Sequence, residues 1–269
     1  MADIPVLPLA VVARELERFR AAAPLVHVLT NEVVQEISAN VLLAAGASPA
    51  MVVARQEVRA FTPMAGALLI NVGTLHEQRL ESMRQAVATA KLAGVPWTLD
   101  PVAVGVLAYR TEACRALLAQ GPAAIRGNPS EILALAGLAG GGRGVDSTVG
   151  SEAAVEAAIA LARASGAVVA VTGETDYISD GARSWATPWG DPIMTRVVGT
   201  GCALSALVAG FTAQAPDRLD AVAAACAVAG LCGARAAAKA EGPGSFKWNF
   251  LDALYRLQPA ELLAGEIGV

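Results

Sequence analysis

Two glycines, Gly199 and Gly201, stand directly before an apolar stretch in the segment VVGTGCALSALVAGF, residues 197–211. The spacing predicts a turn that leads into a buried helix, and the first backbone N–H groups of such a helix bind anions. Glycine also lets the backbone approach a ligand without a Cβ in the way. The alternative is a tight turn that only packs the helix against a sheet. A third fingerprint glycine and a Gly-Lys dipeptide are both absent from the sequence, so neither a dinucleotide-binding loop nor a P-loop is predicted.

Cys202 follows these glycines, in the first turn of the expected helix. A helix N-terminus lowers the pKa of a thiol and raises its reactivity, so a functional thiol is one reading. The other is a small apolar residue that fills space beneath the loop. An ordinary thiol has a pKa of about 8.5, so Cys202 is a proton acceptor only if its surroundings lower that value.

Two carboxylates and an arginine are expected near the ends of strands. Asp100 ends the run PWTLD, Arg126 lies in the run AAIRG, and Glu131 opens a helix after Asn128-Pro129. Each has a plain alternative, because an aspartate commonly starts a turn and a glutamate in a first turn offsets the helix dipole. Together at one edge of a sheet they suit phosphoryl transfer, through Mg²⁺ and charge neutralisation.

Three further residues are candidates for ligand binding. Thr172 ends the run AVVAVT before a glycine, where its hydroxyl is placed to contact phosphate or to bond to nearby backbone. Asn31 can cap a helix whose apolar face begins at Val33 and which ends at Gly46. Met51 enters the next apolar run, and a methionine suits a flat heteroaromatic ligand but is more often core.

The elements that must position these residues alternate between short β-branched runs and longer helical stretches. This rhythm predicts an α/β protein with a mainly parallel sheet flanked by helices. Two alternating runs around Asp180-Gly181 predict a hairpin over 174–187, and from Gly201 the chain is helical nearly to its end. The strand candidates are 25–29, 67–72, 96–100, 123–127 and 167–173, with helices near 32–45, 76–93, 110–120, 130–138 and 151–165.

No repeat or low-complexity linker divides the sequence, so we expect residues 1–269 to form a single domain. The glycine-rich stretch 137–144 is expected to be a surface loop, because the same rhythm continues on both sides of it. The apolar run 221–234 has 14 residues, whereas a membrane span needs about 20. We therefore expect a buried helix or a helix at a subunit interface, and no membrane association. The N-terminus lacks the features of a signal peptide, which favours a cytoplasmic protein.

The composition argues against other classes of protein. Aromatic residues make up 4% of the chain, the net charge is −4 and no basic run occurs, so nucleic-acid binding is not expected. The four cysteines form no Cys-x-x-Cys pair, and the chain has only two histidines, His27 and His76. A zinc or redox motif and a Ser-His-Asp triad are therefore unsupported.

Several long motifs run in collinear order over roughly residues 25–257. They are TNEVVQEISANVLLAAGASPAM, LLINVGTL, LDPVAVG, IRGNPSEILALAG, GVDS, VTGETDYISDG, VGTGCALSALVAGF and GSFKWNFLDALY. Together they closely resemble hydroxyethylthiazole kinase, a thiamine-pathway family of the ribokinase-like superfamily. The resemblance implies a three-layer αβα fold and a homotrimer with active sites between subunits. It also implies MgATP-dependent phosphorylation of 4-methyl-5-(2-hydroxyethyl)thiazole, in thiamine biosynthesis or salvage.

The same resemblance implies roles for single residues. Met51 and Gly199 look like thiazole-binding positions, and Asn31 and Val33 would line the same pocket. Cys202 occupies the place where many ribokinase-like enzymes carry an aspartate base. A thiol there suggests a group that orients the alcohol and assists modestly.

On the nucleotide side, Arg126 and Thr172 look like ATP-binding positions. Asp100 and Glu131 look like the acidic groups near the phosphates and Mg²⁺, acting through water or phosphate. One departure from the family pattern is the pair Gln35-Glu36, which stands where a more amide-rich or apolar pair is expected. Glu36 either changes the polarity of the pocket or lies on a solvated helix face; we favour the second.

Two alternatives stay open at this point. One is another ribokinase-like activity, such as a pyrimidine-alcohol or sugar kinase, against which the cysteine in GTGC and the GASPAM motif argue. The other is a catalytically silent module that binds a nucleotide or a thiazole, against which the intact acidic and basic positions argue.

Overall fold

The computed structural model describes residues 4–139 and 151–265. In that part of the chain, eight strands form one sheet in the order β2-β1-β3-β4-β5-β6-β7-β8. Neighbours from β2 to β6 are parallel, and β7 and β8 join as antiparallel strands. The strands are β1 (Leu25–Leu29), β2 (Ser48–Ala50), β3 (Ala67–Asn71), β4 (Trp97–Asp100), β5 (Ala124–Gly127), β6 (Val168–Val171), β7 (Asp176–Ser179) and β8 (Ser184–Thr187).

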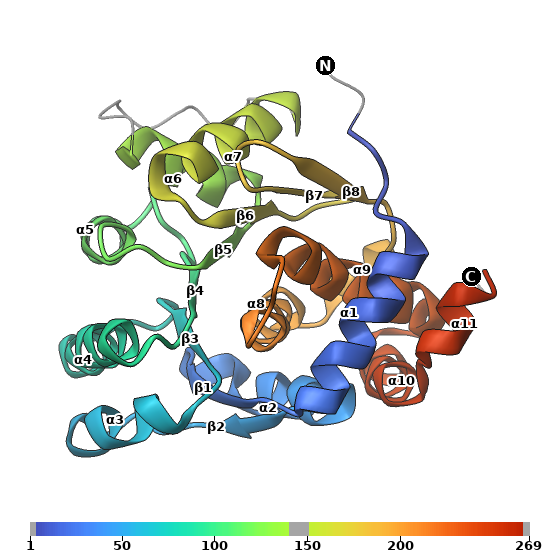
Figure 1. Ribbon diagram of the computed structural model, residues 1–269, viewed down its shortest axis with the longest axis horizontal. Helices are drawn as coiled ribbons and strands as arrows, with labels where there is room; N and C mark the ends of the chain where they lie inside the picture. Colours follow the sequence, from blue (N-terminus) through green and yellow to red (C-terminus); the bar gives the residue numbers. More distant parts are fainter. Residues whose placement is uncertain (1–3, 140–150, 266–269) are drawn as a thin grey trace.

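The predicted strands are confirmed, because their apolar runs are covered on both faces. Every residue of β3 and of β6 is buried, as a parallel sheet between two helical layers requires. Figure 1 shows the helices on both sides of the sheet, in three layers. This arrangement confirms the expected α/β class.

One helical layer contributes to the core cluster that holds Leu68, Ile70 and Leu99. It consists of α3 (Arg55–Phe61), α4 (Glu77–Ala93), α5 (Ala108–Leu118), α6 (Pro129–Ala139) and α7 (Ser151–Ser165). The predicted helices over 76–93, 110–120, 130–138 and 151–165 all lie in this layer. The stretch 137–144 is predicted as a loop, but α6 runs to Ala139 and residues 140–150 lie outside the described part of the chain.

The other layer packs on the opposite face of the sheet and holds the larger core cluster. It consists of α2 (Gln35–Ala45), α8 (Thr200–Thr212) and α9 (Arg218–Ala237), and farther out α1 (Leu9–Ala22), α10 (Pro243–Arg256) and α11 (Pro259–Leu263). Helix α8 packs along β1, β3, β4 and β5, whereas α9 packs along β6, β7 and β8. The start of α8 is thereby held at the centre of the sheet.

The apolar run 221–234 is part of α9, which extends to 20 residues. By length and composition alone this helix could cross a membrane, but 89% of its most apolar window is buried inside the protein. The prediction of a buried helix is therefore confirmed. The alternative of a helix at a subunit interface is wrong, because the small residues of α9 pack against α1, α8 and α10 of the same chain.

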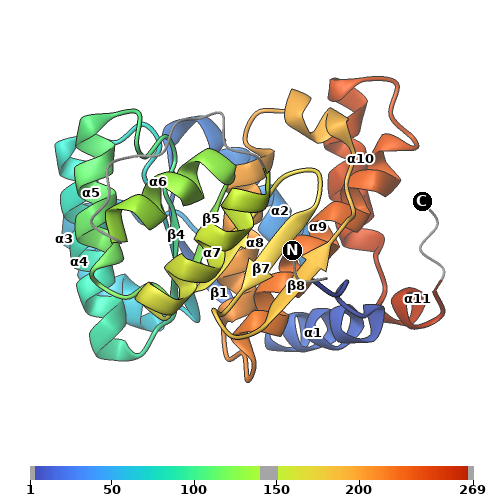
Figure 2. The same ribbon diagram turned by 90° about the horizontal axis from the view of Figure 1, so that it is seen from above.

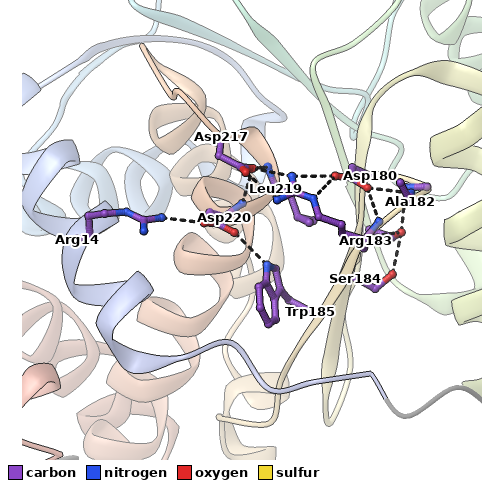
Figure 3. A network of polar contacts seen from close by, with 11 residues as sticks. Arg14, Asp180, Ala182, Arg183, Ser184, Trp185, Asp217, Leu219 and Asp220 are labelled. Atoms are coloured by element: carbon purple, nitrogen blue, oxygen red, sulfur yellow. Dashed lines mark hydrogen bonds and ion pairs between the residues drawn. The ribbon is translucent and has the colours of Figure 1, made fainter.

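The predicted hairpin is confirmed and is tied to the start of α9 (Figure 2). Asp180 accepts hydrogen bonds from the backbone N–H groups of Ala182 (2.9 Å) and Arg183 (2.7 Å), which closes the turn. Arg183 then donates to both carboxylate oxygens of Asp217, at 2.8 and 3.1 Å (Figure 3). Asp217 caps α9 by accepting from the N–H of Leu219 (3.0 Å), so one carboxylate fixes both elements.

The N-terminal helix joins the same network. Arg14 in α1 donates to Asp220 (2.7 Å), and the indole N–H of Trp185 in β8 donates to the other oxygen of that carboxylate (3.0 Å; Figure 3). Helix α1 was not predicted, and neither were the short helix α3 and the edge strand β2. Ser48-Pro49 is typical of a turn, but residues 48–50 pair in parallel with β1.

Candidate active site at the carboxyl edge of the sheet

The residues singled out in the sequence follow one another along the carboxyl edge of the parallel strands. Asn31 follows β1, Asp100 ends β4, Arg126 lies in β5 and Thr172 follows β6. Because the carboxyl ends of parallel strands meet at one edge, this is where such sheets hold ligands. The start of α8, with Cys202, packs over β3, β4 and β5 at this place.

A chain of side-chain amides joins the ends of β1, β3 and β4. Asn31 donates from Nδ2 to Oδ1 of Asn71 (3.1 Å), and Asn71 donates from Nδ2 to Oδ2 of Asp100 (2.6 Å). Asn71 and Asp100 are register partners in the sheet. Asn71 was not predicted as a site residue. It ends the apolar run ALLIN just as Asp100 ends the run PWTLD, and a polar residue at the end of a strand was the signal that could have found it.

Asp100 is buried, and burial raises the pKa of its carboxyl to about 6. Arg126 opposes this rise in pKa and Glu131 adds to it, so both charged groups lie within electrostatic reach of Asp100. Hydrogen bonds from Ser205 and Asn71 also favour the ionised form. The sheet edge thus holds a buried carboxylate, Asp100, that interacts with a nearby guanidinium, Arg126.

Cys202 lies beside these groups, with its Sγ 3.6 Å from Nδ2 of Asn31. A helix N-terminus lowers the pKa of a thiol, but burial, reinforced by the negative charge of Asp100, raises the pKa of Cys202 to about 11, so the condition for a proton acceptor is not met. Hydrogen bonds from Asn71 and Asn31, and the charge of Arg126, only partly offset the burial. The thiol is therefore protonated at neutral pH.

Arg126 reaches across the strand ends to α8 and β6. Its Nη2 donates to the hydroxyl of Thr172, while its buried Nε has no hydrogen-bond partner in the described part of the chain. A Cβ placed on Gly201 would lie 2.7 Å from Nη1 of Arg126, so the guanidinium lies directly against the first turn of α8. A buried cationic N–H without a partner, next to a helix N-terminus, is suited to a phosphate oxygen.

Glu131 lies in the first turn of α6 and is held by backbone groups. Its Oε1 accepts from the N–H of Ala103 (3.1 Å) and its Oε2 from the N–H of Asn128 (2.9 Å). Asn128 in turn accepts from the N–H of Glu131 (2.9 Å), which is a reciprocal helix cap. The carboxylate is fixed near Asp100 but already serves the helix start and the loop after β4.

Gly199 caps α8 in the left-handed region, at φ +87°. A Cβ there would lie 2.8 Å from both Val34 and Ile37, so the glycine turn is packed on α2 and the short helix η1 (Glu32–Val34). Asn31 caps η1 by accepting from the N–H of Val33 (3.1 Å). Val33 itself is 61% exposed, so its expected place on the buried helix face is wrong.

Met51 lies farther along the sheet edge, away from Arg126. It follows the edge strand β2 and packs, half-buried, against the core on the α2 side. Four strand spacings separate β2 from β5, which is about 19 Å. A cavity of about 1160 Å³ lies elsewhere, between Val53–Gln56 and the first half of α4, and none of the predicted site residues lines it.

Glu36 lies on the exposed side of α2 and forms an ion pair with Lys247 of α10 (2.8 Å). This favours the solvated-face reading of the departure in the first motif. Among the described residues, no group of three or more His, Cys, Asp or Glu side chains is arranged to hold a metal ion.

The model of the hydroxyethylthiazole kinase family matches residues 16–260. The chain belongs to this family. It is 61% identical to a hydroxyethylthiazole kinase of Serratia proteamaculans, over 96% of this chain and 97% of that protein. The resemblance inferred from the motifs is therefore confirmed, and the chain is a kinase.

Solved structures support the same assignment. The hydroxyethylthiazole kinase of Pyrococcus horikoshii superposes on this family member with a TM-score of 0.86 and 38% identity, covering 92% of this chain and 93% of that one. A ribokinase-like superfamily protein of Enterococcus faecalis has a TM-score of 0.68 at 15% identity, over 96% and 98% of the two chains. The second likeness concerns the fold alone, and it confirms the ribokinase-like αβα architecture.

Proposed function

We propose that the chain transfers the γ-phosphoryl group of ATP to the hydroxyl of 4-methyl-5-(2-hydroxyethyl)thiazole, in thiamine biosynthesis or salvage. The observation that carries this proposal is the meeting of Arg126, Asp100 and the first turn of α8 at one edge of the sheet. In a chain of the hydroxyethylthiazole kinase family, this is the place where a transferring phosphoryl group finds a cation, an acid and free helix N–H groups.

The order of residues along the sheet edge suggests how the two substrates lie. Arg126 and Thr172, at β5 and β6, would hold the ATP phosphates, with the unpartnered Nε of Arg126 donating to one of them. Asn31 and Met51, at β1 and β2, would contact the thiazole. The hydroxyl and the γ-phosphate then meet between them, at Gly199, Gly201 and Cys202, where the first N–H groups of α8 point.

The acidic groups of the site fit Mg²⁺, which proteins bind through one or two carboxylates while it keeps waters and phosphate oxygens. Asp100 fits because its neighbours stabilise the buried negative charge only in part, as its pKa of about 6 indicates, and a cation would complete that stabilisation. Glu131 fits only through water or phosphate, because backbone N–H groups already occupy both of its oxygens. When bound, Mg²⁺ would neutralise charge on the phosphates.

On the alcohol side, the side chains orient the acceptor. Cys202, protonated because burial raises its pKa to about 11, would donate a hydrogen bond to the alcohol oxygen or pack against it. Loose phosphoryl transfer depends mainly on positioning and charge neutralisation, so a strong base is not needed. Gly199, whose lack of a side chain lets the turn pack on η1 and α2, would present its backbone to the ring, and Met51 and Val33 would supply apolar contacts.

We further propose a cytoplasmic homotrimer in which the whole chain, residues 1–269, acts as one kinase domain and the sites lie between subunits. The support for a subunit contact is the exposure of two apolar side chains beside the glycine turn, Val33 (61%) and Val198 (72%). Light scattering after size-exclusion chromatography tests it. A mass of three chains is expected, and a monomer would remove the shared site.

The choice of acceptor is tested by offering ATP together with different alcohols. Phosphorylation of the thiazole alcohol should exceed that of a pyrimidine alcohol and of a sugar by a wide margin in kcat/KM. Preference for either of the latter would favour another ribokinase-like activity, and the product is identified by mass spectrometry.

A further inference from the structure

Asn71 has no predicted role, yet it lies at the centre of the site. It ends β3, between β1 and β4, and its side chain is fully buried. It cannot touch a bound substrate from there without a rearrangement. Any influence it has on the reaction must pass through its hydrogen-bond partners.

The hydrogen bonds of Asn71 fix which end of its amide faces which neighbour. The N–H of Gly73 donates to the side chain at 2.9 Å, and a backbone N–H can only donate, so the atom it meets is the carbonyl oxygen. The NH₂ group must then face Asp100, where Oδ2 lies 2.6 Å away. The two hydrogen-bond partners therefore fix the orientation of the Asn71 amide.

The same argument fixes the orientation of the Asn31 amide. The N–H of Val33 donates to its Oδ1 (3.1 Å), so its NH₂ group faces Oδ1 of Asn71 and the Sγ of Cys202. Two backbone N–H groups, one at each end, therefore set both amides. Without the Asn71 carbonyl, the NH₂ group of Asn31 loses its buried acceptor and the side chain is free to turn.

We propose that Asn71 is a positioning residue for the alcohol substrate: its carbonyl oxygen holds the amide of Asn31, and with it the thiol of Cys202, in the orientation that receives the alcohol. Its NH₂ group holds Asp100 on the phosphate side, so one buried amide sets the two halves of the site relative to each other. This role rests on the proposed function, since Asn31 and Cys202 are its link to the substrate.

The two ends of the Asn71 amide are separable by substitution. Asn71→Leu removes both the acceptor for Asn31 and the donor to Asp100, with a somewhat larger side chain that branches at the same atom. Asn71→Asp keeps an oxygen for Asn31 and Gly73 but places a second carboxyl group against Asp100, so that the two carboxyl groups must share a proton and Asp100 is no longer held as the ionised partner of an amide. Thr98→Val in β4 is the matched control, because the buried hydroxyl of Thr98 has no hydrogen-bond partner in the described part of the chain.

The test measures the Kd of 4-methyl-5-(2-hydroxyethyl)thiazole for nucleotide-free protein by calorimetry, and then kcat and KM. Asn71→Leu should weaken alcohol binding about tenfold to a hundredfold, the usual range for residues that orient ligand-contacting groups. Asn71→Asp should bind the alcohol within about threefold of wild type, a difference below 1 kcal/mol, but should lose kcat. Thr98→Val should match wild type in both.

A purely structural role predicts a different result, in which melting temperatures fall and the folded variants bind the alcohol normally. Folded Asn71→Leu with the wild-type Kd would overturn the proposal, as would Asn71→Asp losing as much binding as Asn71→Leu. If Asn71→Leu does not fold, Asn71→Ser, whose hydroxyl is too short for Asn31, takes its place with the same expectation. If the wild-type protein does not bind the alcohol, the proposed function itself is contradicted, and the role of Asn71 with it.

Discussion

The guanidinium of Arg126 and the backbone of Gly201 lie so close that a Cβ on the glycine would stand 2.7 Å from Nη1. The two residues come from β5 and from α8, 75 positions apart in the sequence. Their contact brings a cation to the start of a helix whose N–H groups favour an anion. The contact joins a strand end to the glycine turn, and substitution can probe it directly.

Gly201→Ala should raise the KM for ATP about tenfold, the effect of losing one charge-assisted hydrogen bond. Alanine favours a helix over glycine by about 1 kcal/mol, so α8 itself should gain stability while Arg126 is displaced. Gly244→Ala in α10, where an added Cβ meets no atom within 4 Å, makes the same replacement in another helix and should leave the KM for ATP unchanged. An unchanged KM for ATP in folded Gly201→Ala would show that the position of Arg126 does not matter.

Cys202→Ala should lower kcat, by about tenfold, without abolishing activity, because positioning and charge neutralisation remain. Since burial holds the pKa of the thiol at about 11, wild-type kcat should show no step from Cys202 between pH 7 and 9. Cys202→Ser, which keeps a hydrogen-bond donor, should lie between the two. Complete loss of activity in folded Cys202→Ala would mean that the thiol is an essential base.

Asp100→Asn should make the protein more stable at pH 7. Burial raises the Asp100 pKa from 3.8 to about 6, so between about pH 4 and 6 the folded state binds more protons than the unfolded chain. Stability therefore falls as the pH rises through this window, by on the order of 2–3 kcal/mol for this group. The substitution removes that loss, although it should also remove activity.

Urea unfolding at several pH values, without Mg²⁺, measures this effect. The gain in unfolding free energy should be present at pH 7 and should vanish below about pH 4, whereas Asp252→Asn on the exposed side of α10 should show no change. Burial also raises the pKa of Asp176 to about 6, so the unfolding free energy of Asp100→Asn should still fall to some extent as the pH rises. A destabilised Asp100→Asn at pH 7 would mean that the carboxylate stabilises the fold.

Gly230→Ala should destabilise the protein by about 1–3 kcal/mol, since extra atoms in a packed interior force backbone shifts. A Cβ there would lie 2.4 Å from the carbonyl oxygen of Trp189, in the segment that leads to the glycine turn. Because that contact is with backbone, a rotamer change cannot relieve it. Urea unfolding beside Gly244→Ala decides the matter: equal stability of the two variants would contradict the packing.

Much of the fold could be predicted because its apolar runs are long and regularly spaced. The run 25–29 became β1 without change, and Asp180-Gly181 predicted the hairpin through local turn chemistry. The edge strand β2 was missed since Ser48-Pro49 is typical of a turn, and a proline is tolerated at an edge. Helix α1 depends on distant partners, among them Asp220 in α9, which no local pattern reveals.

The meeting of the candidate residues at the sheet edge could be predicted, but their electrostatics could not. Asp100, Arg126 and Thr172 were found because each stands near a strand end, and the fold brings such ends together. The direction of the Cys202 pKa was not, because a helix N-terminus lowers it while burial beside Asp100 raises it, and only the coordinates say which effect is larger. Asn71 was overlooked because it lies inside the apolar run 67–72, which predicted a strand and nothing more.

The most direct test of this account measures ADP release from MgATP by the wild-type protein, with and without 4-methyl-5-(2-hydroxyethyl)thiazole. ADP should form rapidly only when the thiazole alcohol is present, in equal amount to the phosphorylated thiazole. No increase in ADP on addition of the alcohol, in protein that is folded and binds ATP, would contradict the assignment of the sheet edge as a thiazole kinase site.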